Sequence, residues 1–321
     1  MKRSNTGAGL MQQVLRLSRR DALRGIGMSL AVVPLARVLG CATDPIVGEG
    51  EGEGEGEGEG EGEGEGEGEA PLTGWATGGT AAMTAAASYP NPFTSGLAEE
   101  SCALTCTLTF GPCYAPSAPV GRADISEGEP GIPVRLMLRV VELEGCAPVA
   151  GAELEIWHCN IDGLYSGDDV ESGAFCTSND EHAEASYFAR GRAIADADGT
   201  VTFDTTFPGW YAGRAIHIHI CVRRAAFAGG TTDNDTAVIS QVFFPEALTA
   251  AIFAEVDGYR QHGQPDTGFD NDSVLGSVDD IAPYLVDYAR MTDGAMLAWK
   301  TITISDDESC GGGGGGGGPP P

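Results

Sequence analysis

Short apolar runs separated by turn residues constrain the fold of this chain most strongly. Residues 132–142, 152–158, 200–205, 215–222 and 238–244 alternate apolar and polar side chains or are rich in β-branched residues. The segments between them are rich in Gly, Asp, Asn and Pro, which favour turns. Many short strands separated by turns predict a β-sandwich or a barrel.

The body of the chain offers one clear helix, residues 245–256, which begins with a proline at its first turn. No long amphipathic helical pattern accompanies it. Hydrophobic residues make up 42% of the chain, a normal fraction for a globular domain. The expected fold is therefore all-β, a β-sandwich core with short helices and long loops.

Residues 1–40 have the layout of an export signal. Arg19 and Arg20 precede a short apolar run that ends in a small residue. The adjacent arginines resemble a twin-arginine signal, which carries folded proteins across the bacterial inner membrane. We therefore expect an exported protein, in the periplasm or on the cell surface.

Cys41 closes a run, residues 38–41, that resembles a lipobox, in which the cysteine receives a lipid. That lipid is the only membrane contact that the sequence predicts. The alternative is an uncleaved membrane helix. It is disfavoured because the apolar run contains Pro34 and Arg37 and is shorter than the roughly 20 residues that a membrane span needs.

Composition divides the rest of the chain into segments. Residues 41–100 are expected to be a spacer followed by an irregular linker, because a strict Glu-Gly alternation over 48–69 has nothing to bury and repels itself. The Gly- and Pro-rich tail, 309–321, is expected to be disordered. The folded domain is predicted at 101–308.

Charge and cysteine content narrow the possible partners and the compartment. The formal net charge of −29 repels phosphate backbones, which excludes a nucleic-acid partner. Apart from Cys41, eight cysteines remain, and an even number in an exported protein predicts disulfides whose pairing the sequence does not fix. The alternative is a zinc site, for which Cys102 and Cys106 have a permitted spacing.

Two histidines separated by one residue, His217 and His219, lie in a predicted strand. Residues two apart in a strand point to the same side, so both imidazoles project together. The isoleucines at 216, 218 and 220 take the opposite side, as core residues would. The pair therefore predicts a metal site.

The residues alone leave the other metal ligands open. A ferrous site would need a carboxylate or a further histidine, and His262 with Glu246 or Glu255 is one candidate set. Tyr165 and Tyr211 are nearer candidates. Their phenolate oxygens would be hard anionic donors, which favour a ferric ion.

Several motifs together resemble the intradiol ring-cleavage dioxygenases, specifically their exported, protocatechuate 3,4-dioxygenase-like members. The motifs lie at residues 111–114, 124–128, 152–166, 207–219 and 240–245. The resemblance implies a β-sandwich that carries a non-haem ferric ion, Fe(3+). It also implies an enzyme that opens a catechol ring between its two hydroxyl-bearing carbons, inserts both atoms of O2 and yields a muconate-type diacid.

The same resemblance implies the residues of the site. The implied iron ligands are Tyr165, Tyr211, His217 and His219. Arg214 and Gln241 match family residues that face the bound catechol, and Tyr211 matches the tyrosinate that the substrate displaces. One departure is the short interval between Tyr211 and His217, which is longer in the larger cytoplasmic relatives. One wall of the substrate pocket is therefore expected to be different or absent.

Two other functions stay open. The first is an exported surface lipoprotein whose β-sandwich binds a ligand or a metal without turnover. The second is a copper or zinc site formed by His217, His219 and a cysteine. The expected partners of the enzyme are a small aromatic diol and O2. The sequence leaves open which catechol is the substrate and which oligomeric state the protein adopts.

Overall fold

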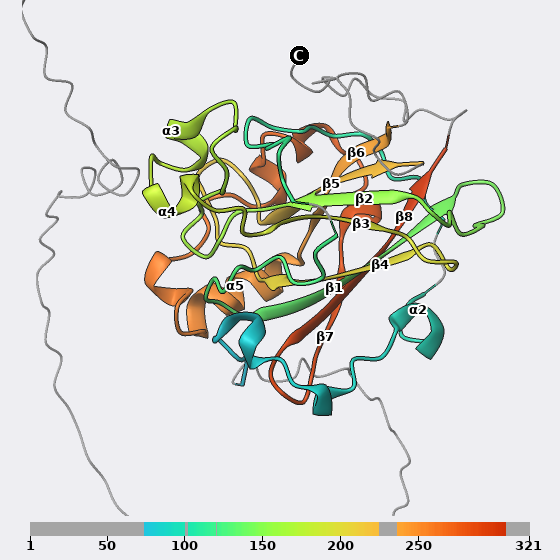
Figure 1. The fold of residues 1–321 in the computed structure, drawn as a ribbon, viewed down its shortest axis with the longest axis horizontal. Helices are drawn as coiled ribbons and strands as arrows, with labels where there is room; N and C mark the ends of the chain where they lie inside the picture. The colour runs from blue at the N-terminus through green and yellow to red at the C-terminus, as the bar shows by residue number, and fades with distance from the viewer. Residues whose placement is uncertain (1–73, 100–101, 120, 225–235, 306–321) are drawn as a thin grey trace, which may run out of the picture. The chain divides into compact units, whose positions relative to one another are not determined.

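The computed structural model describes residues 74–99, 102–119, 121–224 and 236–305. The expected export signal, Cys41, the Glu-Gly spacer and the Gly/Pro tail lie outside the described residues. Two four-stranded sheets pack face to face around one main core (Figure 1). The prediction of an all-β sandwich with short helices and long loops is confirmed.

The two sheets differ in strand direction. The first has the order β4-β1-β8-β7 and the second β3-β2-β5-β6. The pairing of β1 with β8 is parallel, and the other neighbouring pairs in both sheets are antiparallel. The strands are β1 (Pro133–Glu142), β2 (Glu153–Trp157), β3 (Arg190–Ile194), β4 (Thr200–Thr206), β5 (His217–Arg223), β6 (Thr236–Phe243), β7 (Asp287–Arg290) and β8 (Met296–Ile304).

The helices of the described residues are short connectors. The α-helices are α2 (Pro92–Ser95), α3 (Gly173–Cys176), α4 (Glu181–Glu184) and α5 (Glu246–Glu255). The 3-10 helices are η1 (Gly79–Ala82), η2 (Ala85–Ala87), η3 (Arg260–His262), η4 (Phe269–Asn271), η5 (Leu275–Ser277) and η6 (Ala282–Tyr284). Helix α5 matches the predicted helix. Within the described ranges, no helix is long and apolar enough to cross a membrane.

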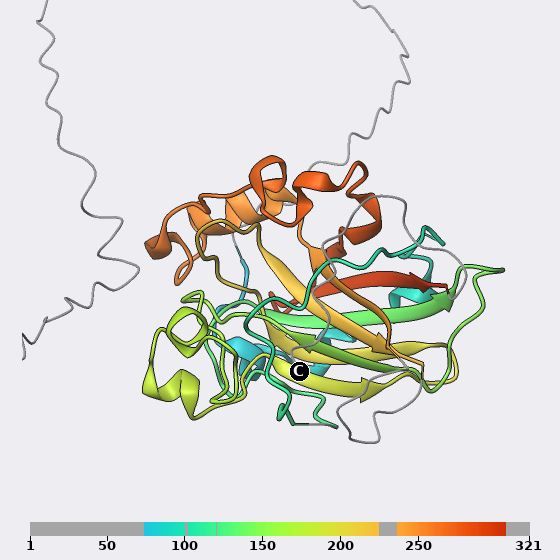
Figure 2. The same ribbon diagram turned by 90° about the horizontal axis from the view of Figure 1, so that it is seen from above.

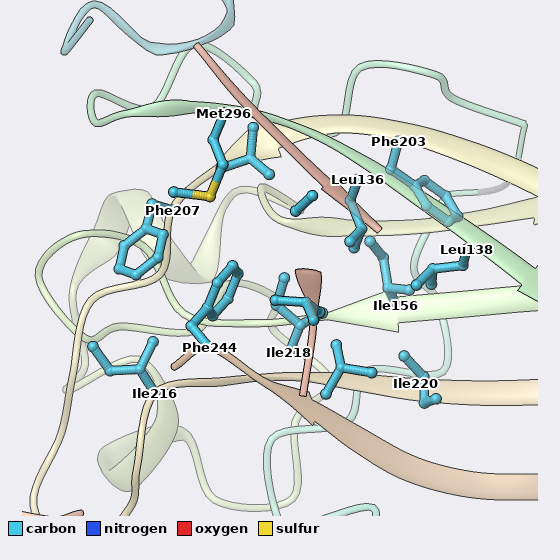
Figure 3. Packing of buried hydrophobic residues seen from close by; sticks show 14 of the residues in the cluster. Leu136, Leu138, Ile156, Phe203, Phe207, Ile216, Ile218, Ile220, Phe244 and Met296 are labelled. Carbon is cyan, nitrogen blue, oxygen red and sulfur yellow. The ribbon is translucent and has the colours of Figure 1, made fainter. Parts of the chain in front are cut away.

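Alternation along the strands decides which side chains form the core. Leu136 of β1, Ile156 of β2 and Ile218 of β5 meet between the sheets with Phe203 and Phe244 (Figure 3). Burial of each such side chain stabilises the fold by about 1.5–3 kcal/mol. Because side chains on a strand alternate, the odd-numbered residues of β5 lie on the other, outer face of the second sheet.

Strands β3, β7 and β8 are not apparent from the sequence pattern. Strand β8 is central in its sheet and buried on both faces, so its residues do not alternate between apolar and polar. Leu297 and Trp299 pack outward against Tyr89 and Phe93. A strand covered on both faces resembles any other apolar run in a sequence.

Residues 74–99, which the sequence places in an irregular linker, pack on the domain. Trp75 is buried in the main core, the Gly79 N–H donates to the Gly131 carbonyl at 2.9 Å, and the Thr84 N–H donates to Asp293 at 2.8 Å. The segment lacks a helical or strand period because it docks through separate contacts. The folded domain therefore begins before the predicted boundary at residue 101.

Candidate metal centre

The candidate metal ligands lie on the outer face of the second sheet. His217 and His219 occupy successive outward positions of β5, and both are almost completely buried by the loops that cover this face. Ile218 between them points into the core. Figure 2 shows the second sheet from above, with the chain segments that cross over it.

Four donor atoms converge at this point. Tyr165 Oη lies 3.3 Å from Tyr211 Oη and 3.4 Å from His217 Nε2. Tyr211 Oη lies 3.2 Å from His217 Nε2, which lies 3.1 Å from His219 Nε2. The structure thus brings together all four residues that the family resemblance implies as ligands.

These distances fit a bound metal ion. Four donors arranged tetrahedrally at about 2 Å from a common ion would lie about 3.3 Å from one another. Two phenol oxygens and two imidazole nitrogens are also a plausible donor set for a hard trivalent ion. The arrangement can therefore hold a metal once both phenols lose their protons.

Two loops carry the tyrosines, and close backbone contact sets their spacing. The Gly209 N–H donates to the Asn160 carbonyl at 3.0 Å, and a Cβ at Gly209 would lie 2.4 Å from the Ile161 carbonyl oxygen. A Cβ at Gly163 would lie 2.3 Å from the Trp210 carbonyl oxygen. Only glycine permits these approaches, which bring the segments of Tyr165 and Tyr211 together.

Hydrogen bonds orient both imidazole rings. His217 Nδ1 lies 2.6 Å from the Ala215 carbonyl, so we assign the ring proton to Nδ1, which leaves the Nε2 lone pair facing the other donors. The Thr109 carbonyl accepts a hydrogen bond from the His219 ring. Trp157 stacks on that ring at 4.8 Å. Fixed tautomers of this kind are typical of metal-binding histidines.

Burial keeps all four groups neutral in the metal-free protein. It raises the pKa of Tyr165 well above its ordinary value and the pKa of Tyr211 to about 12. It lowers the pKa of His217 to about 3 and the pKa of His219 well below 6.5. Both histidines thus offer lone pairs at neutral pH, whereas both phenols would have to release a proton on metal binding.

Arg214 and Gln241 lie beside the four donors, and they contact each other. Arg214 Nη2 donates to Gln241 Oε1. Gln241 Nε2 donates to the Thr109 carbonyl at 3.3 Å and lies 3.3 Å from His219 Nδ1. The structure therefore brings both residues that are predicted to face the substrate next to the histidines of β5.

Two buried charged residues near the site were not found from the sequence. Asp272 accepts a hydrogen bond from Arg214 Nε at 3.0 Å. Arg190 is buried, with its guanidinium carbon 5.9 Å from the Tyr165 ring centroid, and it donates to the carbonyls of Ser166 and Cys113 at 2.6 and 2.7 Å. A single sequence gives no signal for either residue, because their partners are distant along the chain.

The cysteine arrangement does not support the zinc alternative. Cys102 forms a disulfide with Cys146, and Cys113 forms one with Cys176. Within the described residues no group of three or more His, Cys, Asp or Glu is placed to hold a metal ion. The proposed copper or zinc set of His217, His219 and a cysteine would need such a group.

His262 and Glu246, two of the residues considered for a ferrous site, have other contacts. His262 lies 3.7 Å from Asp162, and Glu246 accepts a hydrogen bond from the Phe269 N–H at 2.8 Å.

A separate cleft of about 700 Å³ lies against the first sheet. It is lined by Thr80, Met83, Thr84, Ala85, Ser88, Tyr89, Asp124, Arg135 and Asp204, so none of the four donors lines it.

Comparison with known proteins gives the same family. Residues 109–233 match a family model described as Dioxygenase. The chlorocatechol 1,2-dioxygenase of Pseudomonas sp. (strain P51) is 30% identical over 143 residues, which are 38% of this chain and 51% of that protein. The 6-chlorohydroxyquinol 1,2-dioxygenase of Cupriavidus pinatubonensis is 27% identical over 195 residues, 58% of this chain and 59% of that protein.

A solved structure shares the fold. The intradiol ring-cleavage dioxygenase of Tetranychus urticae superimposes with a TM-score of 0.53 at 24% identity, over 65% of this chain and 98% of that one. The chain spans little more than half the length of the two curated relatives described above. With the motifs in the same order along the chain, residues 109–233 are similar to the catalytic region of these dioxygenases.

Proposed function

We propose that this protein is a non-haem Fe(III) dioxygenase that opens a catechol-type ring between its two hydroxyl-bearing carbons with O2. The observation that carries the proposal is the convergence of two phenol oxygens and two imidazole nitrogens, each of which lies within 3.1–3.4 Å of at least one of the others. The family match supports the reaction class. The product would be a muconate-type diacid that contains both atoms of O2.

Tyr165, Tyr211, His217 and His219 would hold the ferric ion. A ferric ion bound there would act as a Lewis acid on the diol oxygens and draw electron density from the ring, which activates the ring toward O2. Tyr211 is the less buried of the two tyrosines. It is therefore better placed than Tyr165 to yield its position to the incoming diol.

Proton transfer and charge stabilisation would fall to side chains of this chain. Because burial raises the pKa of Tyr211 to about 12, its released phenolate oxygen would be a strong base and would take up a proton from the diol. Arg214 lies next to the donors, and its positive charge would stabilise negative charge that develops on the substrate.

The direct test combines metal content, colour and oxygen uptake. The purified protein, reconstituted with iron, is expected to bind about one ferric ion per chain and to show a visible tyrosinate-to-iron absorption band. Catechol, a chlorocatechol and a hydroxyquinol are the substrates to try, because the relatives carry those names. Oxygen uptake with a product heavier than the diol by one O2 would support ring cleavage.

Matched tyrosine variants locate the chromophore. Tyr165→Phe is expected to shift or abolish the band, whereas Tyr114→Phe should leave it intact, because the Tyr114 hydroxyl contacts Glu155 at 3.2 Å instead. A colourless reconstituted protein would contradict the ligand set. A coloured protein that takes up no oxygen with any diol would favour the binding lipoprotein without turnover.

We also propose that the protein is exported in its folded state and anchored through a lipid on Cys41. The disulfides Cys102–Cys146 and Cys113–Cys176 support an oxidising compartment. Changing Arg19 and Arg20 to lysine should retain the protein inside the inner membrane, and Cys41→Ala should release it from membranes. Iron-loaded protein that still arrives outside would contradict the twin-arginine route.

A further inference from the structure

Asp272 is the most heavily hydrogen-bonded carboxylate next to the candidate metal centre. Its side chain is fully buried. One oxygen, Oδ2, accepts from Arg214 Nε at 3.0 Å and from the Ala215 N–H at 2.7 Å. The other, Oδ1, accepts from the Val274 and Leu275 N–H groups at 2.7 and 2.9 Å. Each carboxylate oxygen therefore serves a different segment.

The division between the two oxygens indicates a role beyond the local turn. The two hydrogen bonds to Oδ1 close the turn that begins at Asp272. These two bonds would be sufficient if the carboxylate served that turn alone. The contacts of Oδ2 instead reach the segment that leads into β5, at Arg214 and Ala215. Buried Arg–carboxylate contacts are directional, because the guanidinium is planar and its donors are fixed in a fork.

The guanidinium of Arg214 is thereby held on two of its edges. Nε donates to Asp272, and Nη2 donates to Gln241 Oε1. No described residue accepts a hydrogen bond from Nη1, and the Arg214 side chain remains 11% exposed. The donors left uncommitted are thus the ones that an incoming diol could meet.

We infer that Asp272 is a positioning residue that acts through Arg214, by fixing the guanidinium so that its Nη1 donors face the diol. The inference rests on the proposed function, because it concerns the same substrate. Asp272 itself would touch neither the diol nor the metal. Its lowered pKa, which arises against the effect of burial from Arg214 and three backbone N–H groups, agrees with a carboxylate that stays charged.

The test is a double-mutant cycle in the iron-loaded enzyme. Arg214→Ala is expected to lower turnover by on the order of 100-fold, as the loss of a preorganised electrostatic donor does. Asp272→Asn should lower it by about 10–100-fold, as loss of a supporting partner does. In the Arg214→Ala background, Asp272→Asn should cause no further loss, because nothing remains for it to position.

Two further readouts separate positioning from general damage. Asp272→Asn should keep the iron content and the visible band, and an anaerobic titration with catechol, followed by that band, should show weaker diol binding. The control is Asp270→Asn, an exposed aspartate two residues away, which should match the wild type in every measurement. If Asp272→Asn is not recovered folded, Asp272→Glu, which keeps the charge but shifts the oxygens, replaces it in the cycle.

The outcomes distinguish the two claims. Losses that multiply in the double variant, or an Asp272→Asn enzyme equal to the Asp270→Asn control, would overturn the positioning role while leaving the proposed function intact. Loss of iron in Asp272→Asn would also overturn it, since the effect would then pass through the metal ligands. A wild-type protein that neither binds nor consumes any diol would overturn the proposed function itself.

Discussion

His158 illustrates how burial controls ionisation at single residues near the site. Its ring is completely buried, and its two nitrogens each lie 2.8 Å from a partner, the Cys159 carbonyl and the Thr205 hydroxyl. Burial is the main cause that lowers its pKa to about 4. The folded protein therefore keeps this histidine neutral under conditions in which the unfolded chain would protonate it.

The protein should lose stability as the pH falls from about 6.5 toward 4. In that window the unfolded chain binds a proton at His158 and the folded chain does not, so protonation favours unfolding. His158 should account for about 2 kcal/mol of the loss between pH 7 and pH 5, and His217 and His219, whose pKa values burial also lowers, should add to it. Denaturant titrations of wild type and His158→Gln at the two pH values measure it, since the glutamine cannot titrate.

His182 provides a control of opposite sign. It is largely exposed and contacts Glu129 at 2.7 Å, which raises its pKa, so its protonation favours the folded state and its contribution is lost as the pH rises. His182→Gln should therefore not reduce the acid sensitivity. A His158→Gln protein with the pH slope of the wild type would contradict the assignment.

The sequence predicts which side chains of the candidate site lie together where a motif is local. The pairing of His217 with His219 follows from strand alternation alone, whereas the two tyrosines follow only from the family resemblance. Asp272 could not be found, because its contact with Ala215 joins residues 57 positions apart and depends on how a loop folds back. Patterns in a sequence report neighbours along a strand, not across loops.

At the scale of loops and strands, Gly209→Ala is expected to disrupt iron binding. The added Cβ would lie 2.4 Å from the Ile161 carbonyl oxygen, so the loop of Tyr211 must move away from the loop of Tyr165. Iron content and the visible band should both fall. Gly276→Ala is the matched control, because nothing lies within 4 Å of its Cβ position. Unchanged iron binding in Gly209→Ala would show that the two loops can separate without cost to the site.

The disulfide Cys113–Cys176 supports the loop that carries Tyr165. The Tyr165 N–H donates to the Cys176 carbonyl at 2.9 Å, and Arg190 donates to the Cys113 carbonyl at 2.7 Å. Both ends of the disulfide thus contact segments that hold the candidate ligand. Its loss should affect the site as well as the stability of the fold.

Replacing Cys113 and Cys176 by serine should lower the free energy of unfolding by about 2–4 kcal/mol and also weaken iron binding. Replacing Cys102 and Cys146, which form the other described disulfide, should cost comparable stability but leave iron binding intact. Denaturant titrations and iron titrations of the two double variants provide the comparison. Equal iron affinity in both would contradict a role for Cys113–Cys176 at the site.

The sequence predicts the elements unevenly for a physical reason. Strands β1, β2, β4, β5 and β6 have recognisable apolar patterns, and their positions agree within a few residues. Strand β8 and residues 74–99 are not predicted, because they cover each other. Burial on both faces removes the alternation of apolar and polar residues from β8. Tertiary contact, not local preference, makes these segments regular or ordered.

At the scale of the whole molecule, removal of β8 should abolish folding. This strand lies between β1 and β7, and it contributes Met296, Ala298 and Ile302 to the main core. A chain that stops after residue 293 would leave β1 with an open edge and the core exposed. It is expected to show no cooperative unfolding transition in denaturant, and a cooperative transition would contradict the central role of β8.

The parallel pairing of β1 with β8 also fixes the order of events during synthesis. Val134 pairs with Met296, so the first sheet cannot close until nearly all of the described domain has left the ribosome. Contacts between residues so distant in sequence make folding slow, because the entropy of the intervening chain is lost before these contacts stabilise the fold. A newly synthesised chain therefore passes through an interval in which it is complete but not yet folded. If the protein is exported in its folded state, as proposed above, transport would have to wait for that interval to end, and chaperones would have to protect the exposed core until then.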